Sequence, residues 1–106
     1  MAKVLHSTDS DFNKILSENH LVLADFWATW CNPCQMVSPI IEKIASEYEN
    51  KVSVIKINID NDREIAEKFN VQSIPTVILF QDSNEVLRKI GAMSFEDYTN
   101  EINKYL

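Results

Sequence analysis

Two short, nearly continuous apolar runs constrain the fold of this chain more than any other feature. The first, "LVLADFW", covers Leu21–Trp27, and the second, "VSVIKINI", covers residues 52–59 and is rich in β-branched side chains. Runs of this kind are typical of strands whose two faces are both covered. Between them, from about residue 33 to residue 49, apolar residues recur at helical spacing. A strand, a helix and a strand in this order predict parallel strands joined by a right-handed crossover.

The segments before and after these runs extend the alternation of strands and helices. A short apolar start at residues 4–6 precedes a helix for which Thr8 and Asp11 resemble a capping box. A second short helix is expected at about residues 63–69, directly after the second apolar run.

The C-terminal part of the chain predicts an antiparallel pair and a last helix. Residues 76–80 and 86–90 flank "QDSNE", which indicates a hairpin with an Asn or Asp at the turn. Ser94 should cap the last helix, and Pro39 should kink the long helix earlier in the chain. The predicted order is β-α-β-α-β-α-β-β-α, an α/β fold with a mixed central sheet and helices on both faces.

Length and charge exclude several classes of protein. The 106 residues fit a single domain, residues 1–106, without a linker. The net charge of −6, with no run of Lys or Arg, argues against nucleic-acid binding. No apolar run approaches the length of a membrane span, and "MAKVLHSTDS" lacks the apolar region of a secretory signal. The chemistry of the two cysteines is therefore expected to operate in a reducing, cytoplasmic compartment.

Cys31 and Cys34 lie two residues apart in "FWATWCNPCQMV" and could form a metal site, a structural bridge or a reactive pair. Structural zinc needs four ligands, and only the distant His6 and His20 could complete the set, so we expect no metal. A bridge closing so short a loop stabilises by only ~2 kcal/mol, against ~3 kcal/mol for a fifteen-residue loop. The spacing permits a disulfide that is weakly stabilising and easily reduced, so the pair can cycle.

The predicted position of Cys31 also favours reactivity. It follows the first apolar run and precedes the long helix, so it should lie at the positive end of the helix dipole. Pro33 suits the first helical turn. Together these features are expected to lower the pKa of the Cys31 thiol from ~8.5 to ~7. Such a thiolate leaves readily when Cys34, one turn into the helix, attacks a mixed disulfide.

Four blocks of the sequence resemble the thioredoxin family. "DFWATWCNPC", "VIKINID", "SIPT" and "IGA" are similar to family motifs and follow in family order and spacing over essentially the whole chain. The resemblance implies the thioredoxin fold and dithiol–disulfide oxidoreductase activity toward protein substrates, without a cofactor. It also implies a monomer that a thioredoxin reductase recharges.

The same resemblance assigns roles to individual residues. Cys31 would be the attacking thiol and Cys34 the resolving thiol. Pro75 would be a cis-proline beside the disulfide, and the backbone of Ile74 would hydrogen-bond an extended substrate. A flat apolar surface for docking would be formed by Trp30, Ile74, Pro75, Gly91 and Ala92.

Asp25 is a carboxylate inside an apolar run, where burial should raise its pKa. The residues alone leave two interpretations open, a structural ion pair with Lys56 or a functional acid. The resemblance favours the second: Asp25 would take the proton of Cys34, and Lys56 would tune that acid.

Two positions depart from the family pattern. Asn32 stands where the family usually has Gly, and Gln35 where a cation is common. Asn32 and Pro33, between the cysteines, would tune the redox potential, in a direction that the sequence does not assign. A net oxidant or isomerase, and a docking module whose dithiol is incidental, are the competing functions.

Overall fold

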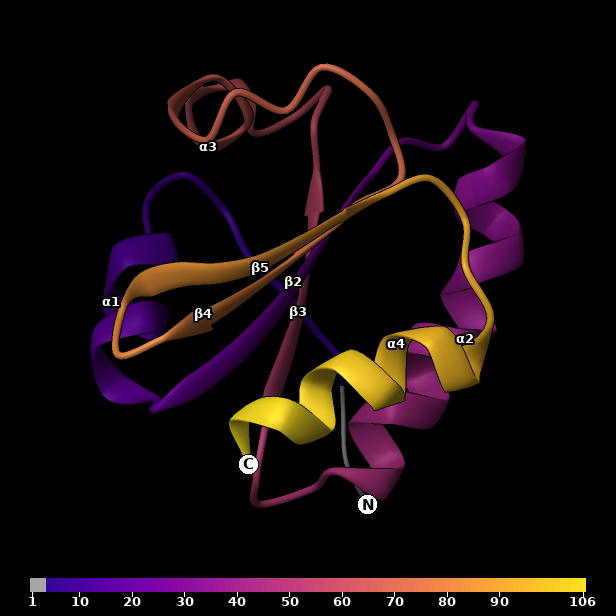
Figure 1. Ribbon diagram of the computed structural model, residues 1–106. Coiled ribbons are helices and arrows are strands. Elements are labelled where there is room, and N and C mark those ends of the chain that lie inside the picture. The colour runs from indigo at the N-terminus through magenta and orange to yellow at the C-terminus, as the bar shows by residue number, and fades with distance from the viewer. Residues whose placement is uncertain (1–3) are drawn as a thin grey trace.

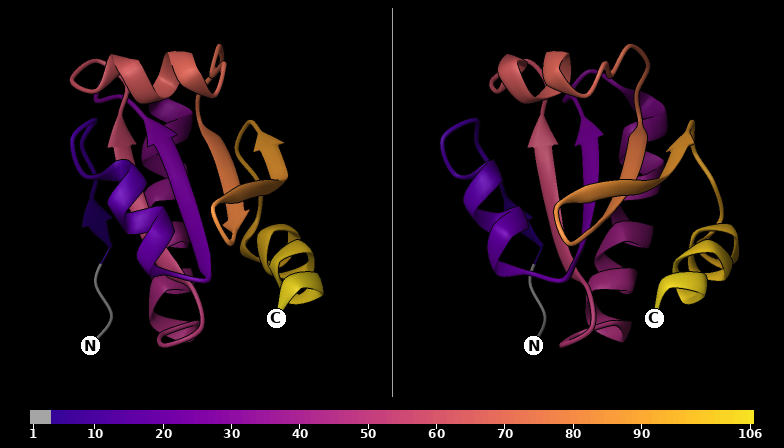
Figure 2. Two further views of the ribbon diagram at one scale, coloured as in Figure 1. Left: turned by 90° about the vertical axis from the view of Figure 1, so that its left-hand side faces the viewer. Right: turned by 60° about the vertical axis from the view of Figure 1, so that its left-hand side comes forward.

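The computed structural model describes residues 4–106, so residues 1–3, which begin the predicted domain and "MAKVLHSTDS", lie outside the described residues. Within the described part, the strands form one sheet in the order β1-β3-β2-β4-β5 (Figures 1 and 2). The strands are β1 (Leu5–His6), β2 (Leu21–Trp27), β3 (Ser53–Asn58), β4 (Thr76–Gln81) and β5 (Asn84–Ile90). β3 is parallel to β1 and β2, whereas β4 is antiparallel to β2 and β5, which confirms the predicted mixed sheet.

Helices cover both faces of this sheet (Figure 2). They are α1 (Phe12–Glu18), α2 (Asn32–Glu47), α3 (Arg63–Lys68) and α4 (Phe95–Ile102), followed by a 3-10 turn (Asn103–Tyr105). α2 and α4 pack on one face, and α1 and α3 on the other. The predicted order of elements is therefore confirmed. No helix in residues 4–106 is long and apolar enough to cross a membrane.

The central strand β2 divides its side chains between the two faces. Leu21 and Leu23 belong to the core beneath α2 and α4, whereas Val22 and Ala24 belong to the core beneath α1 and α3. Because successive side chains of a strand point to opposite faces, Asp25 projects toward α2 and α4. α2 begins after the carboxyl end of β2, so its first turns cover this end of the strand.

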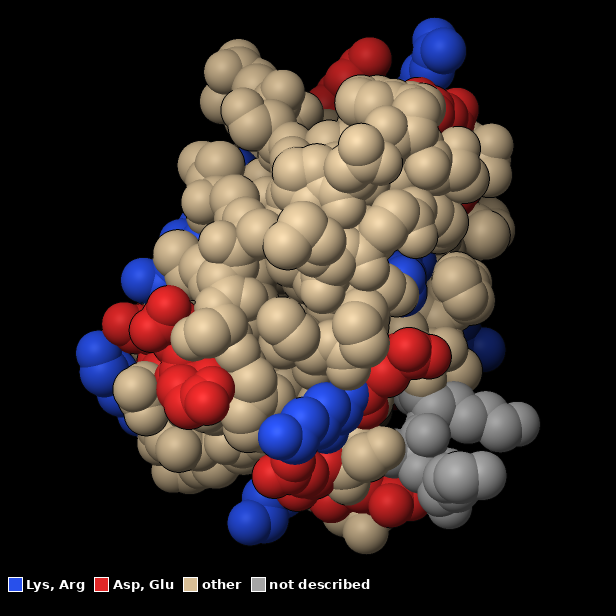
Figure 3. All heavy atoms as spheres, turned by 90° about the vertical axis from the view of Figure 1, so that its right-hand side faces the viewer, with Lys and Arg blue, Asp and Glu red and all other residues tan. Residues whose placement is uncertain are grey.

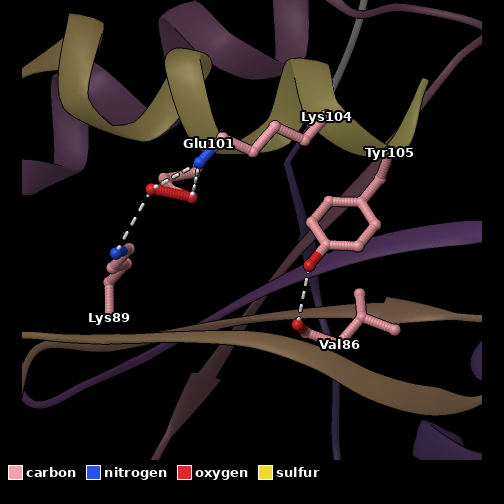
Figure 4. Close-up of polar contacts among 5 residues, drawn as sticks. All are labelled: Val86, Lys89, Glu101, Lys104 and Tyr105. Carbon is pink, nitrogen blue, oxygen red and sulfur yellow. Dashed lines mark hydrogen bonds and ion pairs between the residues drawn. The ribbon is translucent and has the colours of Figure 1, made fainter.

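α4 and the 3-10 turn after it also make polar contacts with the edge strand β5 (Figure 4). The Tyr105 hydroxyl donates a hydrogen bond to the Val86 carbonyl at 3.0 Å. Glu101 lies between two cations, 3.6 Å from Lys89 Nζ and 3.1 Å from Lys104 Nζ (Figure 4). These contacts fix the C-terminal segment along β5, from Val86 near its start to Lys89 next to its end.

The start of α1 differs from the prediction. The helix begins at Phe12 with Asp11 as its N-cap, so Thr8 does not cap it. The Asp11 carboxylate instead accepts a hydrogen bond from the Thr8 N–H at 2.8 Å, while the Thr8 hydroxyl lies 2.9 Å from Ser10 Oγ. Of the two hydrogen bonds of a capping box, only the one from the Thr8 N–H to the Asp11 carboxylate is formed. The Thr8 hydroxyl pairs with Ser10 instead of capping the helix.

The hairpin between β4 and β5 turns at Asp82 and Ser83, with φ of 50° and 71°. The predicted Asp at the turn is confirmed. β5 starts at Asn84, two residues before the predicted strand, so Asn84 is part of the ladder and pairs with Gln81. Ser83 therefore occupies a left-handed conformation that usually favours Gly or Asn.

Candidate active site

A disulfide joins Cys31 and Cys34, whose Cα atoms are 5.3 Å apart. Cys31 is the N-cap of α2, and Pro33 lies in the first turn of that helix, as the sequence predicts. The Cys34 N–H donates a hydrogen bond to Cys31 Sγ at 3.2 Å. Both residues are buried, at 5% and 3% exposed, so in this oxidised state neither sulfur is openly accessible. Asn32, between the cysteines, is exposed.

Two loops from other elements meet the disulfide. The Ile74–Pro75 peptide bond is cis, and the Ile74 carbonyl oxygen lies 3.8 Å from Cys31 Sγ. The disulfide sulfur carries no hydrogen, so this is a contact rather than a hydrogen bond. The Gly91 N–H donates to the Pro75 carbonyl at 2.8 Å, which ties the loop after β5 to the loop before β4. Gly91 has φ of 94°, a conformation that disfavours any residue with a Cβ.

The predicted docking residues differ in their exposure. Trp30 is 67% exposed, and its indole N–H donates to Asp60 at 2.8 Å. Ala92 is exposed, and Ile74 and Gly91 are half-buried. Pro75 is buried.

Two exposed apolar residues near the disulfide were missed from the sequence. Met36 is 71% exposed in the first turns of α2, and Ile90 is 59% exposed directly before Gly91. Met36 falls within the stretch of helical apolar spacing, but its neighbour Val37 is the residue that faces the core. The available signal was the three- and four-residue spacing from Cys34 through Val37 to Ile41, which leaves Met36 off the buried face.

The face of the molecule on which α2 and α4 lie is poor in charge. Figure 3 shows Lys, Arg, Asp and Glu side chains mainly along the lower, left and upper edges of this face, whereas its middle is mostly uncharged. Gln35, where a cation was noted as common in the family, is exposed at the start of α2.

Asp25 is a buried carboxyl without a hydrogen bond at one of its oxygens. It is 1% exposed, and Oδ1 has no partner. In the sheet it lies opposite Lys56 of β3 and Val77 of β4. Burial raises the pKa of Asp25 to about 7, although the positive charge of Lys56 opposes the rise. A carboxyl that titrates near neutral pH can both accept and return a proton.

Lys56 does not form the direct structural pair that the sequence left open. Its Nζ donates a hydrogen bond to Ser38 Oγ at 2.9 Å and lies 4.6 Å from the centroid of the Trp27 ring. Trp27, the last residue of the first apolar run, packs beside the disulfide, and its indole N–H is buried without a partner.

Tyr98 of α4 brings a phenol to the same region. It is 2% exposed, and its hydroxyl donates to the Gly91 carbonyl at 3.4 Å. Burial, and then the negative charge of Asp25, raise the pKa of Tyr98 to about 12. Sequence reasoning did not single out Tyr98 or Ser38 as site residues. The spacing of four residues from Cys34 to Ser38 was the one available signal for the latter.

The two histidines that were weighed as zinc ligands, His6 and His20, are both exposed. Among residues 4–106, no group of three or more His, Cys, Asp or Glu side chains is arranged to hold a metal ion.

Comparisons with known proteins give a consistent result. The thioredoxin family model matches residues 3–104. A thioredoxin from Haemophilus influenzae is 36% identical over 107 residues, covering 100% of both chains. A bifunctional thioredoxin reductase/thioredoxin from Mycobacterium leprae is 53% identical over 83 residues, which are 78% of this chain and 18% of that protein. The structure of a mutant thioredoxin from Halobacterium salinarum superimposes with a TM-score of 0.90 at 32% identity, covering 97% of this chain and 90% of that one.

Proposed function

Because the chain belongs to the thioredoxin family, we propose that it reduces disulfides in proteins with Cys31 as the attacking thiol and Cys34 as the resolving thiol. The family and the CxxC pair together make the chain a protein-disulfide oxidoreductase. The observation that carries the residue roles is the position of the disulfide at the start of α2, where the Cys34 N–H already donates to Cys31 Sγ. The same N–H and the helix dipole would stabilise a Cys31 thiolate after reduction.

In the first step, the Cys31 thiolate attacks one sulfur of the substrate disulfide. The substrate S–S bond breaks, a mixed disulfide forms with Cys31, and the other substrate sulfur leaves as a thiolate. In the second step, Cys34 gives its proton to the Asp25 carboxylate and attacks Cys31 Sγ. The mixed disulfide breaks, the Cys31–Cys34 bond re-forms, and the second substrate thiolate leaves. The substrate has then gained two electrons, and its thiolates take up protons.

Several observations support Asp25 as the proton acceptor. Its side chain projects toward α2, the helix that carries Cys34, and its pKa of about 7 is close to the working pH. Oδ1 is unpartnered and so can receive a proton without breaking an existing hydrogen bond.

Docking of an extended substrate segment would use the loops beside the disulfide. The Ile74 carbonyl oxygen lies 3.8 Å from Cys31 Sγ, so a substrate segment bound to the Ile74 backbone would run past the reactive sulfur. Trp30, Met36, Ile90 and Ala92 would supply apolar contact around it. Apart from Asp60, which accepts the Trp30 hydrogen bond, these residues are uncharged, so apolar contact and backbone hydrogen bonds would provide most of the affinity.

The oxidised pair must be recharged with two electrons, and we propose a thioredoxin reductase as their source. The support is the fused Mycobacterium leprae protein, which carries both names in one chain. We also propose that the protein is a single domain and acts as a monomer in the cytoplasm, where a reducing environment keeps dithiols available.

The test is the reduction of insulin disulfides with dithiothreitol as the electron source. The wild-type protein should accelerate insulin reduction catalytically, and Cys31→Ser should abolish the acceleration. Cys34→Ser should accumulate a mixed disulfide through Cys31. A free Cys31 in that variant would contradict the assigned roles, and no turnover by the wild type would favour the docking module. Equilibration with a glutathione buffer then separates a reductant from a net oxidant.

A further inference from the structure

The hydrogen bond from Lys56 to Ser38 has no role in the reaction steps proposed above. Ser38 lies four residues after Cys34 on α2, so the two side chains share one face of the helix, one turn apart. The Lys56 ammonium is held between the Ser38 hydroxyl, at 2.9 Å, and the face of the Trp27 ring, at 4.6 Å from its centroid. Both contacts suit a cation that is only 9% exposed. The Ser38 hydroxyl oxygen accepts a hydrogen bond from the ammonium, and the Trp27 ring presents its negative π face to the charge.

This arrangement directs the ammonium away from the buried acid. Asp25 and Lys56 are directly opposite in the register of β2 and β3, so their side chains start from neighbouring positions on the same face. Nevertheless, the hydrogen bond of Lys56 goes to Ser38, and Asp25 Oδ1 has no partner. If the ammonium bonded to the carboxylate instead, the shorter separation would stabilise the ionised acid more strongly.

We propose that Ser38 is a positioning residue for the redox reaction: its hydroxyl anchors Lys56 over Trp27 and thereby keeps Asp25 a good acceptor for the Cys34 proton. The proposal rests on the role of Asp25 in the proposed function. A carboxylate paired directly with Lys56 would be a weaker base, so the resolving thiol would be deprotonated more slowly. The raised pKa of Asp25, with burial as its larger cause and Lys56 as the opposing one, agrees with this arrangement.

The other groups that face Asp25 do not titrate in the same pH range in the oxidised protein. Lys56 reaches it from β3 and Tyr98 from α4, while β4 contributes the apolar Val77. The pKa of Tyr98, about 12, keeps its phenol neutral near pH 7. On α2, Cys34 titrates only after reduction, because a disulfide-bonded cysteine has no thiol proton. In the oxidised protein, Asp25 therefore titrates without the cysteines.

The experiment follows the carboxyl carbon of Asp25 by ¹³C NMR as a function of pH in the oxidised protein. In Ser38→Ala the freed ammonium should turn toward Asp25 and lower the titration midpoint by about one pH unit. Ser38→Thr keeps a hydroxyl and should restore the wild-type midpoint. In a Lys56→Met background, Ser38→Ala should give no further shift. An unchanged midpoint in Ser38→Ala, or an equal shift with and without Lys56, overturns the proposal.

The insulin assay separates this proposal from the proposed function. Ser38→Ala should move the Asp25-dependent limb of the pH–rate profile to lower pH by the same amount as the NMR midpoint. Absence of turnover in the wild type would contradict the proposed function, whereas an unchanged NMR midpoint contradicts the role of Ser38 whatever the turnover.

Discussion

At the scale of single residues, Asp25 should control how the stability of the oxidised protein responds to pH. Its pKa is raised from 3.8 to about 7 in the folded state, so between these values the unfolded chain is ionised while the folded chain holds a proton. The free energy of unfolding then falls as pH rises through this range, by up to about 4 kcal/mol if the whole shift is expressed. Below pH ~4 both states are protonated and the penalty disappears.

Asp25→Asn removes this ionisation and gives the matching prediction. Urea unfolding of both proteins at pH 4 and pH 8 should show a smaller loss of stability with rising pH in the variant. The variant should be the more stable protein at pH 8 by several kcal/mol, less the cost of its buried amide. Parallel pH dependences for the two proteins would contradict the assignment of a raised pKa.

The hairpin offers a second prediction at this scale. Ser83 is exposed with φ of 71°, a conformation that costs a residue with a Cβ about 1–2 kcal/mol. Ser83→Gly should therefore raise the free energy of unfolding by about 1 kcal/mol. Asn84→Gly is the control, because Asn84 lies in β5 and glycine in a strand costs about 0.5–1 kcal/mol. Stabilisation by the second variant and not the first would place the turn one residue later.

At the scale of elements, the packing of the 3-10 turn after α4 against β5 can be tested at Tyr105 (Figure 4). Tyr105→Phe removes the hydrogen bond to the Val86 carbonyl and leaves the ring in place, so stability should fall by about 1 kcal/mol. Turnover in the insulin assay should not change, because Val86 lies near the start of β5 and the site lies beyond its end at Ile90. Glu101→Gln, in the ion-pair group beside it, should change stability less. A larger effect at Glu101 would contradict this ranking.

The strands and helices could be predicted because their periodicities are local. The apolar runs of β2 and β3 and the spacing of α2 indicated the order of elements, and Ser94 accepts the predicted capping bond, from the Asp97 N–H. The start of α1 could not be predicted as well, because several nearby hydroxyl and carboxyl groups compete as caps. The exposure of Met36 was not predicted, because Met36 and Val37 are adjacent apolar residues and local pattern alone does not decide which one faces the core.

At the scale of the whole molecule, the polar cluster beneath the disulfide is the part that the sequence could not predict. Its members come from β2, β3, α2 and α4, and they meet only because the sheet and both helices pack together. The residues themselves drew attention to Asp25 and Lys56, and the family resemblance favoured a functional acid over an ion pair. Ser38 and Tyr98 carry no motif, and their contacts with Lys56 and Gly91 depend on tertiary packing.

The middle of the face on which α2 and α4 lie is poor in charge (Figure 3), and this leads to a prediction about substrate docking. Met36 is 71% exposed, so Met36→Ser should cost the folded protein little stability. It should remove about 1 kcal/mol of apolar contact with a protein substrate, which raises KM for insulin about five-fold. A small aromatic disulfide, which reaches the sulfurs without covering this face, should be reduced at the wild-type rate.

Leu106→Ser is the matched control for this effect. Leu106 is 55% exposed and apolar, but it lies at the C-terminus, at the lower end of the molecule in Figure 1, whereas α2 begins at the upper end. Its substitution removes a comparable exposed apolar group without touching the site, so KM for insulin should stay at the wild-type value. Because the face carries few charges, KM of the wild type should also vary little with ionic strength. A strong salt dependence, or equal effects of the two substitutions, would show that apolar contact at this face does not govern docking.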